Sequence, residues 1–152
     1  MTWSNMDRKL KIYLAGKMSG LTYQEMGVWR QEIENKFLIQ SMLANYTIMV
    51  LNPVKLYNFE EVKHQSEKEI MNYDISHVVT SDIIIVNLDG LATSDGSKIE
   101  IYEANYNRKI PVIAFGDKEL YNNLHPWLKE CITRVEKNIE DVVDYVRDFY
   151  MI

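Results

Sequence analysis

Residues 83–101, IIIVNLDGLATSDGSKIEI, decide the fold of this chain. An apolar run ends at Asn87, small residues form a turn, and a helical stretch that contains Glu100 begins near Ser97. A short, continuous apolar run is typical of a strand that is buried on both faces of a parallel sheet. Ligands of open α/β sheets bind at the carboxyl ends of strands, so Glu100 is the first candidate for a catalytic residue.

The position of Glu100 also predicts its charge. A carboxylate in the first turns of a helix is stabilised by the positive end of the helix dipole. We therefore expect Glu100 to be ionised. An ionised, partly desolvated carboxylate can act as a nucleophile or as a base.

Strand-like runs alternate with helical stretches along the whole chain. The expected strands are residues 10–16, 46–51, 82–87, 110–115 and 132–135, and the expected helices are residues 22–40, 66–80, 97–107, 120–130 and 139–150. Such alternation predicts βαβ units and a mainly parallel sheet. We expect one domain, residues 1–152, with a doubly wound, flavodoxin-like or Rossmann-like α/β sheet. It should hold about five strands in the order 2-1-3-4-5, with helices on both faces.

Bulk properties narrow the classes of function. The chain has 152 residues, a net charge of −5 and a single cysteine, Cys131. An acidic chain argues against a nucleic acid polymer as partner, because such binders usually show a basic face. No apolar run approaches the roughly 20 residues of a membrane span, and residues 1–8 lack a signal-peptide core. We therefore expect a cytoplasmic protein that binds no membrane.

The expected topology brings several polar residues together. The first and third strands are neighbours in the order 2-1-3-4-5, so their carboxyl ends converge at the switch point. We expect one crevice there that contains Tyr13, Gly16, Asn87, Asp89 and Glu100.

Each of these features also fits a purely structural role. The loop of residues 16–20, which includes Lys17 and Ser19, can cradle an anion on its N–H groups or be a plain turn. Asn87 and Asp89 also suit a turn, and Asp74 suits a solvated helix face. Ser94-Asp95-Gly96-Ser97 can be an N-cap or a hydrogen-bonding pocket. The three histidines have no paired spacing, so we expect no metal site.

Four motifs together resemble the nucleoside 2-deoxyribosyltransferase superfamily, which includes the related nucleoside 5′-monophosphate N-glycosidases. They span about residues 10–116 and read Tyr13-Leu14-Ala15-Gly16, Asn72-Tyr73-Asp74, Gly96-Ser97-Lys98-Ile99-Glu100-Ile101 and Arg108-Lys109-Ile110-Pro111-Val112. The resemblance implies the doubly wound fold and an enzyme that cleaves N-glycosidic bonds. It implies that the deoxyribosyl group passes from a nucleoside to a free nucleobase, with no metal or organic cofactor.

The resemblance also implies roles for individual residues. Glu100 matches the family's nucleophile, Asp74 the acid that protonates or positions the leaving base, and Tyr13 the hydroxyl that orients the nucleophile. Asn123 matches a segment with which members of the family complete the active site of a neighbouring subunit. The resemblance therefore implies a homo-oligomer. The remaining residues implied in substrate binding are Gly16, Lys17, Ser19, Asn87, Asp89, Ser94, Asp95, Gly96 and Ser97.

Two departures from the family pattern keep other functions open. Ser94 stands where the transferases carry Asp, and Tyr102 stands where they carry Gly. A Ser contacts the 5′-phosphate in the related hydrolases, and Lys17 and Ser19 can add donors. Hydrolysis of nucleoside 5′-monophosphates to free base and sugar 5-phosphate is therefore the main alternative. A nucleotide-binding sensor without catalysis ranks lower, since it has no need of a nucleophile.

Overall fold

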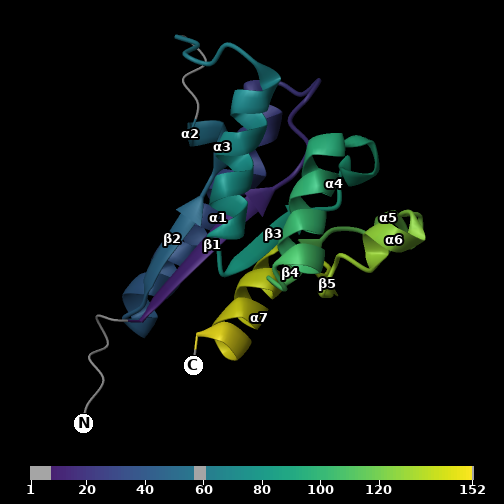
Figure 1. Cartoon of the computed structure of the whole chain (residues 1–152). Coiled ribbons are helices and arrows are strands. Elements are labelled where there is room, and N and C mark those ends of the chain that lie inside the picture. The colour runs from purple at the N-terminus through teal and green to yellow at the C-terminus, as the bar shows by residue number, and fades with distance from the viewer. Residues whose placement is uncertain (1–7, 57–60, 152) are drawn as a thin grey trace.

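The computed structural model describes residues 8–56 and 61–151, and a parallel sheet forms its centre (Figure 1). Five strands lie in the order β2-β1-β3-β4-β5, and every neighbouring pair is parallel. The strands are β1 (Lys9–Ala15), β2 (Thr47–Leu51), β3 (Ile83–Asn87), β4 (Val112–Phe115) and β5 (Arg134–Glu136). The doubly wound fold and the strand order predicted from the sequence are confirmed.

Helices cover both faces of the sheet. The long α1 (Tyr23–Ala44) and the C-terminal α7 (Ile139–Tyr150) pack against each other on one face. The other face carries α3 (Glu67–Val79), α4 (Asp95–Ile101) and the π-helical segment η3 (Tyr102–Asn107) that continues α4. In Figure 1, α3 and α4 stand side by side in front of the strands. Short helices occupy the connections: α2 (Pro53–Leu56), η2 (Leu91–Thr93), α5 (Lys118–Asn122) and α6 (Pro126–Lys129).

The alternation of side chains along β1 supplies a separate core to each face. Ile12 and Leu14 belong to the core under α1 and α7, whereas Tyr13 and Ala15 belong to the core under α3 and α4. Successive side chains of a strand point to opposite faces, so Tyr13 rises from the sheet toward α3 and α4. A strand buried on both faces explains why the central runs of the sequence are apolar without a break.

Side-chain caps determine where the main helices begin. Thr22 and Glu25 form a capping box at α1, and Ser66 and Glu69 form a second one at α3. Ser94 caps α4 by accepting a hydrogen bond from the backbone N–H of Ser97. These caps satisfy N–H groups that have no partner within the helix.

Several boundaries differ from those expected. The first helix continues to Ala44 and ends at Asn45, whose left-handed backbone closes it. The weak helix expected over residues 120–130 is two short helices, because Pro126 starts a new one. The last strand begins two residues later and ends one residue later than expected. In the described ranges no helix combines the length and apolarity that crossing a membrane requires.

Candidate active site

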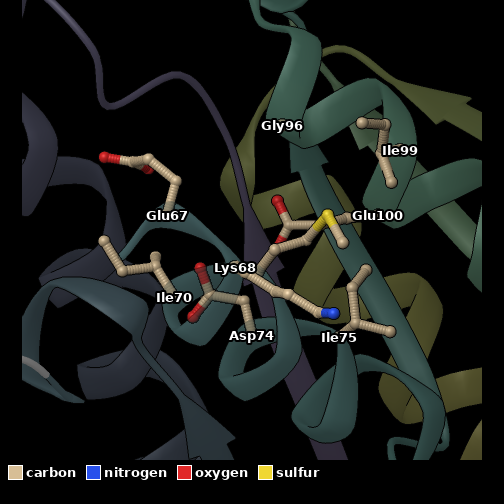
Figure 2. A pocket seen from close by; sticks show the side chains of 9 residues that line it. Glu67, Lys68, Ile70, Asp74, Ile75, Gly96, Ile99 and Glu100 are labelled. Carbon is tan, nitrogen blue, oxygen red and sulfur yellow. The ribbon is translucent and has the colours of Figure 1, made fainter. Parts of the chain in front are cut away.

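A pocket of about 340 Å³ opens between α3 and α4 (Figure 2). Helical spacing places its lining residues on the facing sides of the two helices, since residues three or four apart share a face. The lining comprises Glu67, Lys68, Ile70, Met71, Asp74 and Ile75 from α3, and Gly96, Ile99 and Glu100 from α4. Figure 2 shows the carboxylates of Asp74 and Glu100 entering the pocket from opposite helices.

Four effects determine the pKa of Glu100. Loss of water raises its pKa most strongly, and the nearby carboxylate of Asp74 raises it further. A hydrogen bond from the Tyr13 hydroxyl and the positive charge of Arg30 act in the other direction. The net result is a pKa of about 8. Glu100 is therefore mostly protonated at neutral pH in the ligand-free pocket.

This state corrects the expectation that the helix dipole keeps Glu100 ionised. The dipole acts mainly within the first turn of a helix, and Glu100 is the sixth of seven residues in α4. Desolvation disfavours the charged form of a carboxyl group and outweighs the dipole here. Since Asp74 lies close by, ionising both carboxyl groups at once carries a further cost.

Tyr13 lies beneath the pocket on β1 and is fully buried. Its hydroxyl donates a hydrogen bond to the Glu100 carboxylate. A fixed donor of this kind orients the carboxylate and favours its ionised form. The orienting role that the resemblance implies for Tyr13 stays a prediction.

Asp74 is half-buried and faces the pocket from the middle of α3. The alternative of a fully solvated helix face does not fit this position. Two carboxyl groups in one pocket are a common basis for acid and nucleophile roles.

Arg30 was missed in the sequence analysis. It lies on α1, is fully buried, and donates hydrogen bonds to the carbonyls of Met26 at 2.8 Å and Gly16 at 3.1 Å. Its charge acts on Tyr13, Glu100 and Asp74. The available signal was its spacing, because Arg30 follows Met26 by four residues and thus lies on the buried stripe of α1.

A second pocket, of about 460 Å³, lies beside the loop that follows β1. Its lining is Lys17, Leu21, Glu25, Val28, Trp29, Asn87, Asp89 and Gly90. The Lys17 ammonium donates to the Thr93 hydroxyl at 3.0 Å, and the Asn87 side chain accepts from the backbone N–H of Asp89. The single crevice expected at the switch point is thus two pockets, one with Glu100 and Asp74 and one with Lys17, Asn87 and Asp89.

The remaining predicted residues have mixed locations. Ser94 and Ser97 are joined by a hydrogen bond of 2.8 Å between their hydroxyls, and Ser97 is buried. Asp95 is exposed and lies 3.8 Å from the Lys98 ammonium. Ser19 and Asn123 are exposed and line neither of the two pockets.

Gly16 packs where only glycine fits. A Cβ atom there would lie 2.7 Å from the Trp29 ring and 3.2 Å from the Arg30 guanidinium. The glycine therefore lets the loop after β1 approach α1 closely. Within the described part of the chain, no group of three or more His, Cys, Asp or Glu side chains is arranged to hold a metal ion.

Comparisons with known proteins agree with this fold. The family model described as "Domain of unknown function (DUF4406)" matches residues 10–113, a range that includes Tyr13, Asp74 and Glu100. No curated protein matches the chain. A conserved protein from Enterococcus faecalis is similar in structure, with a TM-score of 0.68 and 21% identity over 92% of this chain and 98% of that chain.

Two further structures are more distant. A 2-deoxyribosyltransferase from Bacillus psychrosaccharolyticus has a TM-score of 0.49 and 19% identity over 89% of this chain and 91% of its own. A protein of unknown function from Vibrio parahaemolyticus has a TM-score of 0.39 and 13% identity over 86% of this chain and 94% of its own.

Proposed function

The chain belongs to the DUF4406 family, whose description assigns no function, and we propose that it cleaves the N-glycosidic bond of (2-deoxy)nucleosides and transfers the sugar to another base. The single observation that supports this most strongly is the convergence of Tyr13, Asp74 and Glu100 at one pocket from β1, α3 and α4. This set contains a nucleophile, a group that orients it and a second carboxyl group for proton transfer.

In the first step of the proposed reaction, a Glu100 carboxylate oxygen attacks the anomeric carbon of the sugar. The bond between that carbon and the base nitrogen breaks, and its electron pair leaves with the base. Asp74 donates a proton to the departing base, as a general acid. The product is a glycosyl ester on Glu100, as in retaining glycoside chemistry.

In the second step, a nitrogen of the acceptor base attacks the anomeric carbon. The ester bond to Glu100 breaks and the carboxylate is regenerated, while the proton of the incoming base passes to Asp74. The configuration at the anomeric carbon is retained, since it is inverted twice.

Proton placement determines the competent form of the pocket. The ligand-free pocket favours protonated Glu100, whereas the reaction requires an ionised Glu100 and a protonated Asp74. In the proposed reaction the proton therefore passes from Glu100 to Asp74 before the attack. The Tyr13 hydroxyl and the Arg30 charge both favour the required form of Glu100.

The walls of the pocket suit a flat, mostly apolar ligand part. Ile70, Met71 and Ile75 line it from α3, and Ile99 lines it from α4. Apolar walls with a few convergent polar groups are typical of small-molecule sites. A nucleobase fits this chemistry.

Hydrolysis of nucleoside 5′-monophosphates is the second candidate. It is favoured by two lysines, because Lys68 lines the Glu100 pocket and Lys17 lines the neighbouring one. Either ammonium can pair with a 5′-phosphate. Water would then take the place of the acceptor base in the second step.

Incubation with deoxynucleosides and, separately, with their 5′-monophosphates tests both candidates. Each substrate is supplied with and without a free base, and the products are separated by chromatography. Base exchange on nucleosides supports transfer, and free base from monophosphates alone supports hydrolysis. Mass spectrometry of an acid-quenched reaction should find the sugar on the peptide that contains Glu100. Absence of product from every substrate would refute both candidates.

A further inference from the structure

Arg30 is a fully buried cation without a paired carboxylate. It interrupts an otherwise apolar stripe of α1 between Met26 and Ile33. Across residues 8–56 and 61–151, no carboxylate lies within ion-pair distance of its guanidinium. Its Nε atom is also buried and has no hydrogen-bond partner there. Burying such a charge is costly, so this position calls for an explanation beyond packing.

The guanidinium is held in a defined place. One terminal nitrogen donates to the Met26 carbonyl one turn earlier on α1, and the other donates to the Gly16 carbonyl. The carbon at its centre lies 4.3 Å from the centre of the Trp29 ring, a cation–π arrangement. Arg30 therefore ties α1 to the end of β1, the strand that carries Tyr13.

Its charge reaches the catalytic groups through the protein interior. Burial lowers the pKa of Arg30 to about 10, so the group stays charged at neutral pH. The electrostatic partners are Tyr13, Glu100 and Asp74. Charges interact more strongly through a poorly hydrated interior than through water, so a cation without its own carboxylate can act on Glu100 without touching it.

We propose that Arg30 is a positioning residue, the buried counter-charge that favours the ionised form of Glu100 while its bond to Gly16 fixes the loop after β1. The use of that ionised carboxylate as a nucleophile rests on the proposed function, whereas the coupling itself does not. The other groups that face Glu100 are Tyr13 on β1 and Asp74, Glu67 and Lys68 on α3, and its own helix adds Asp95 and Lys98.

The test is a titration of Glu100 that needs no substrate. Carbon NMR of carboxyl-labelled glutamate follows Glu100, whose signal is assigned by its loss in Glu100→Gln. Arg30→Gln removes the charge but keeps an amide donor for Gly16, whereas Arg30→Lys keeps the charge but loses the planar fork. Arg147→Gln, at a partly exposed arginine of α7 that pairs with Asp144, is the matched control.

We expect Arg30→Gln to move the midpoint of the Glu100 titration upward by more than about 0.3 pH unit. Arg30→Lys and Arg147→Gln should leave it within about 0.3 of the wild-type midpoint, the pattern expected of a charge effect. An unchanged midpoint in a folded Arg30→Gln protein would overturn the inference. The inference would also be overturned if Arg30→Lys shifted the Glu100 midpoint and Arg30→Gln left it unchanged. That pattern would indicate that Arg30 has a structural role.

A second measurement applies if Arg30→Gln does not fold. The buried Nε–H of Arg30 is followed by nitrogen–proton NMR in the unmodified protein and in Glu100→Gln. Its signal should shift with pH together with Glu100 in the former and stay constant near that midpoint in the latter. A signal that ignores pH in both proteins overturns the coupling. If the titrations behave as expected but no substrate is turned over, the coupling stands and the proposed function fails.

Discussion

The two pockets beside the carboxyl edge of the sheet differ in how well their charged groups are hydrated. Between α3 and α4, Glu100 has lost much of its water, and its pKa has risen to about 8. Beside the loop after β1, the Lys17 ammonium bonds to a threonine hydroxyl and Asp89 remains exposed. The pockets lie close along the chain, since Tyr13 serves the first and Lys17 the second.

This difference suggests that one pocket carries out the reaction and the other binds part of the substrate. Groups with strongly shifted pKa values in a pocket are candidates for proton transfer and nucleophilic attack. Solvated polar groups bind a ligand but gain little reactivity. We therefore propose that the chemistry takes place in the pocket of Glu100 and that the pocket of Lys17 recognises a polar end of the substrate. The following variants test this division.

The largest expected effect is that of Glu100→Gln. It keeps the size of the side chain but removes the nucleophile, so kcat should fall by about 10³-fold or more. Steady-state assay with the best substrate measures this loss. The control is Glu103→Gln, three residues further along on η3, where the carboxylate does not line the pocket and instead contacts Asn107 and Arg108. If Glu100→Gln kept more than about a tenth of the wild-type activity, Glu100 would not be the nucleophile.

Asp74→Asn should have the next largest effect. Loss of a general acid typically lowers the rate by about 10²- to 10⁴-fold. The loss should be smaller for substrates whose base leaves easily, because these depend less on protonation. Rates with two bases of different basicity measure this. Asp144→Asn on α7 serves as the control, and a loss for Asp74→Asn that is equal for both bases would argue against an acid role.

Much of this arrangement could be predicted from the sequence, and the reasons differ for each part. The apolar run at Ile83–Val86 and the alternation of elements were enough for the sheet and its order. The pairing of Asp74 with Glu100 came from the resemblance, since no local pattern links two helices that are separate along the chain. The prediction that Glu100 is ionised was wrong, because its pKa depends on burial and burial depends on tertiary packing.

Arg30 and the division into two pockets show a different limit. The buried stripe of α1 contains Arg30, and a cation at such a position usually extends its charged end into water. In the folded chain it is instead enclosed, because Gly16 lies close to α1 and the guanidinium lies over the Trp29 ring. The strand order brings Asn87 and Glu100 to the same edge of the sheet, but it does not specify which side of the edge each one faces.

Lys17→Ala tests the recognition pocket and should have a moderate effect. If Lys17 binds a 5′-phosphate, KM for monophosphates should rise by about tenfold, with kcat nearly unchanged. KM for nucleosides should stay the same, because they lack the phosphate. Michaelis–Menten assays with matched nucleoside and monophosphate pairs measure this, with the exposed Lys137→Ala as the control. A fall in kcat for both substrate classes would instead mean that Lys17 takes part in the chemical step.

The smallest expected effect concerns stability, and its sign follows from the shifted pKa. Glu100 titrates at about 8 in the folded protein against 4.5 as the unperturbed value, so the folded state holds its proton more tightly. The stability that this proton provides is complete below the unperturbed value and is lost as the pH rises to about 8. Glu100→Gln has no proton to lose. Its melting temperature relative to wild type should therefore increase from about pH 5 to about pH 8.5 and then level off. Thermal denaturation followed by circular dichroism measures the difference, and Glu103→Gln should show no such trend. A constant difference for Glu100→Gln would mean that Glu100 is as well hydrated as the groups around Lys17, and the contrast between the two pockets would be lost.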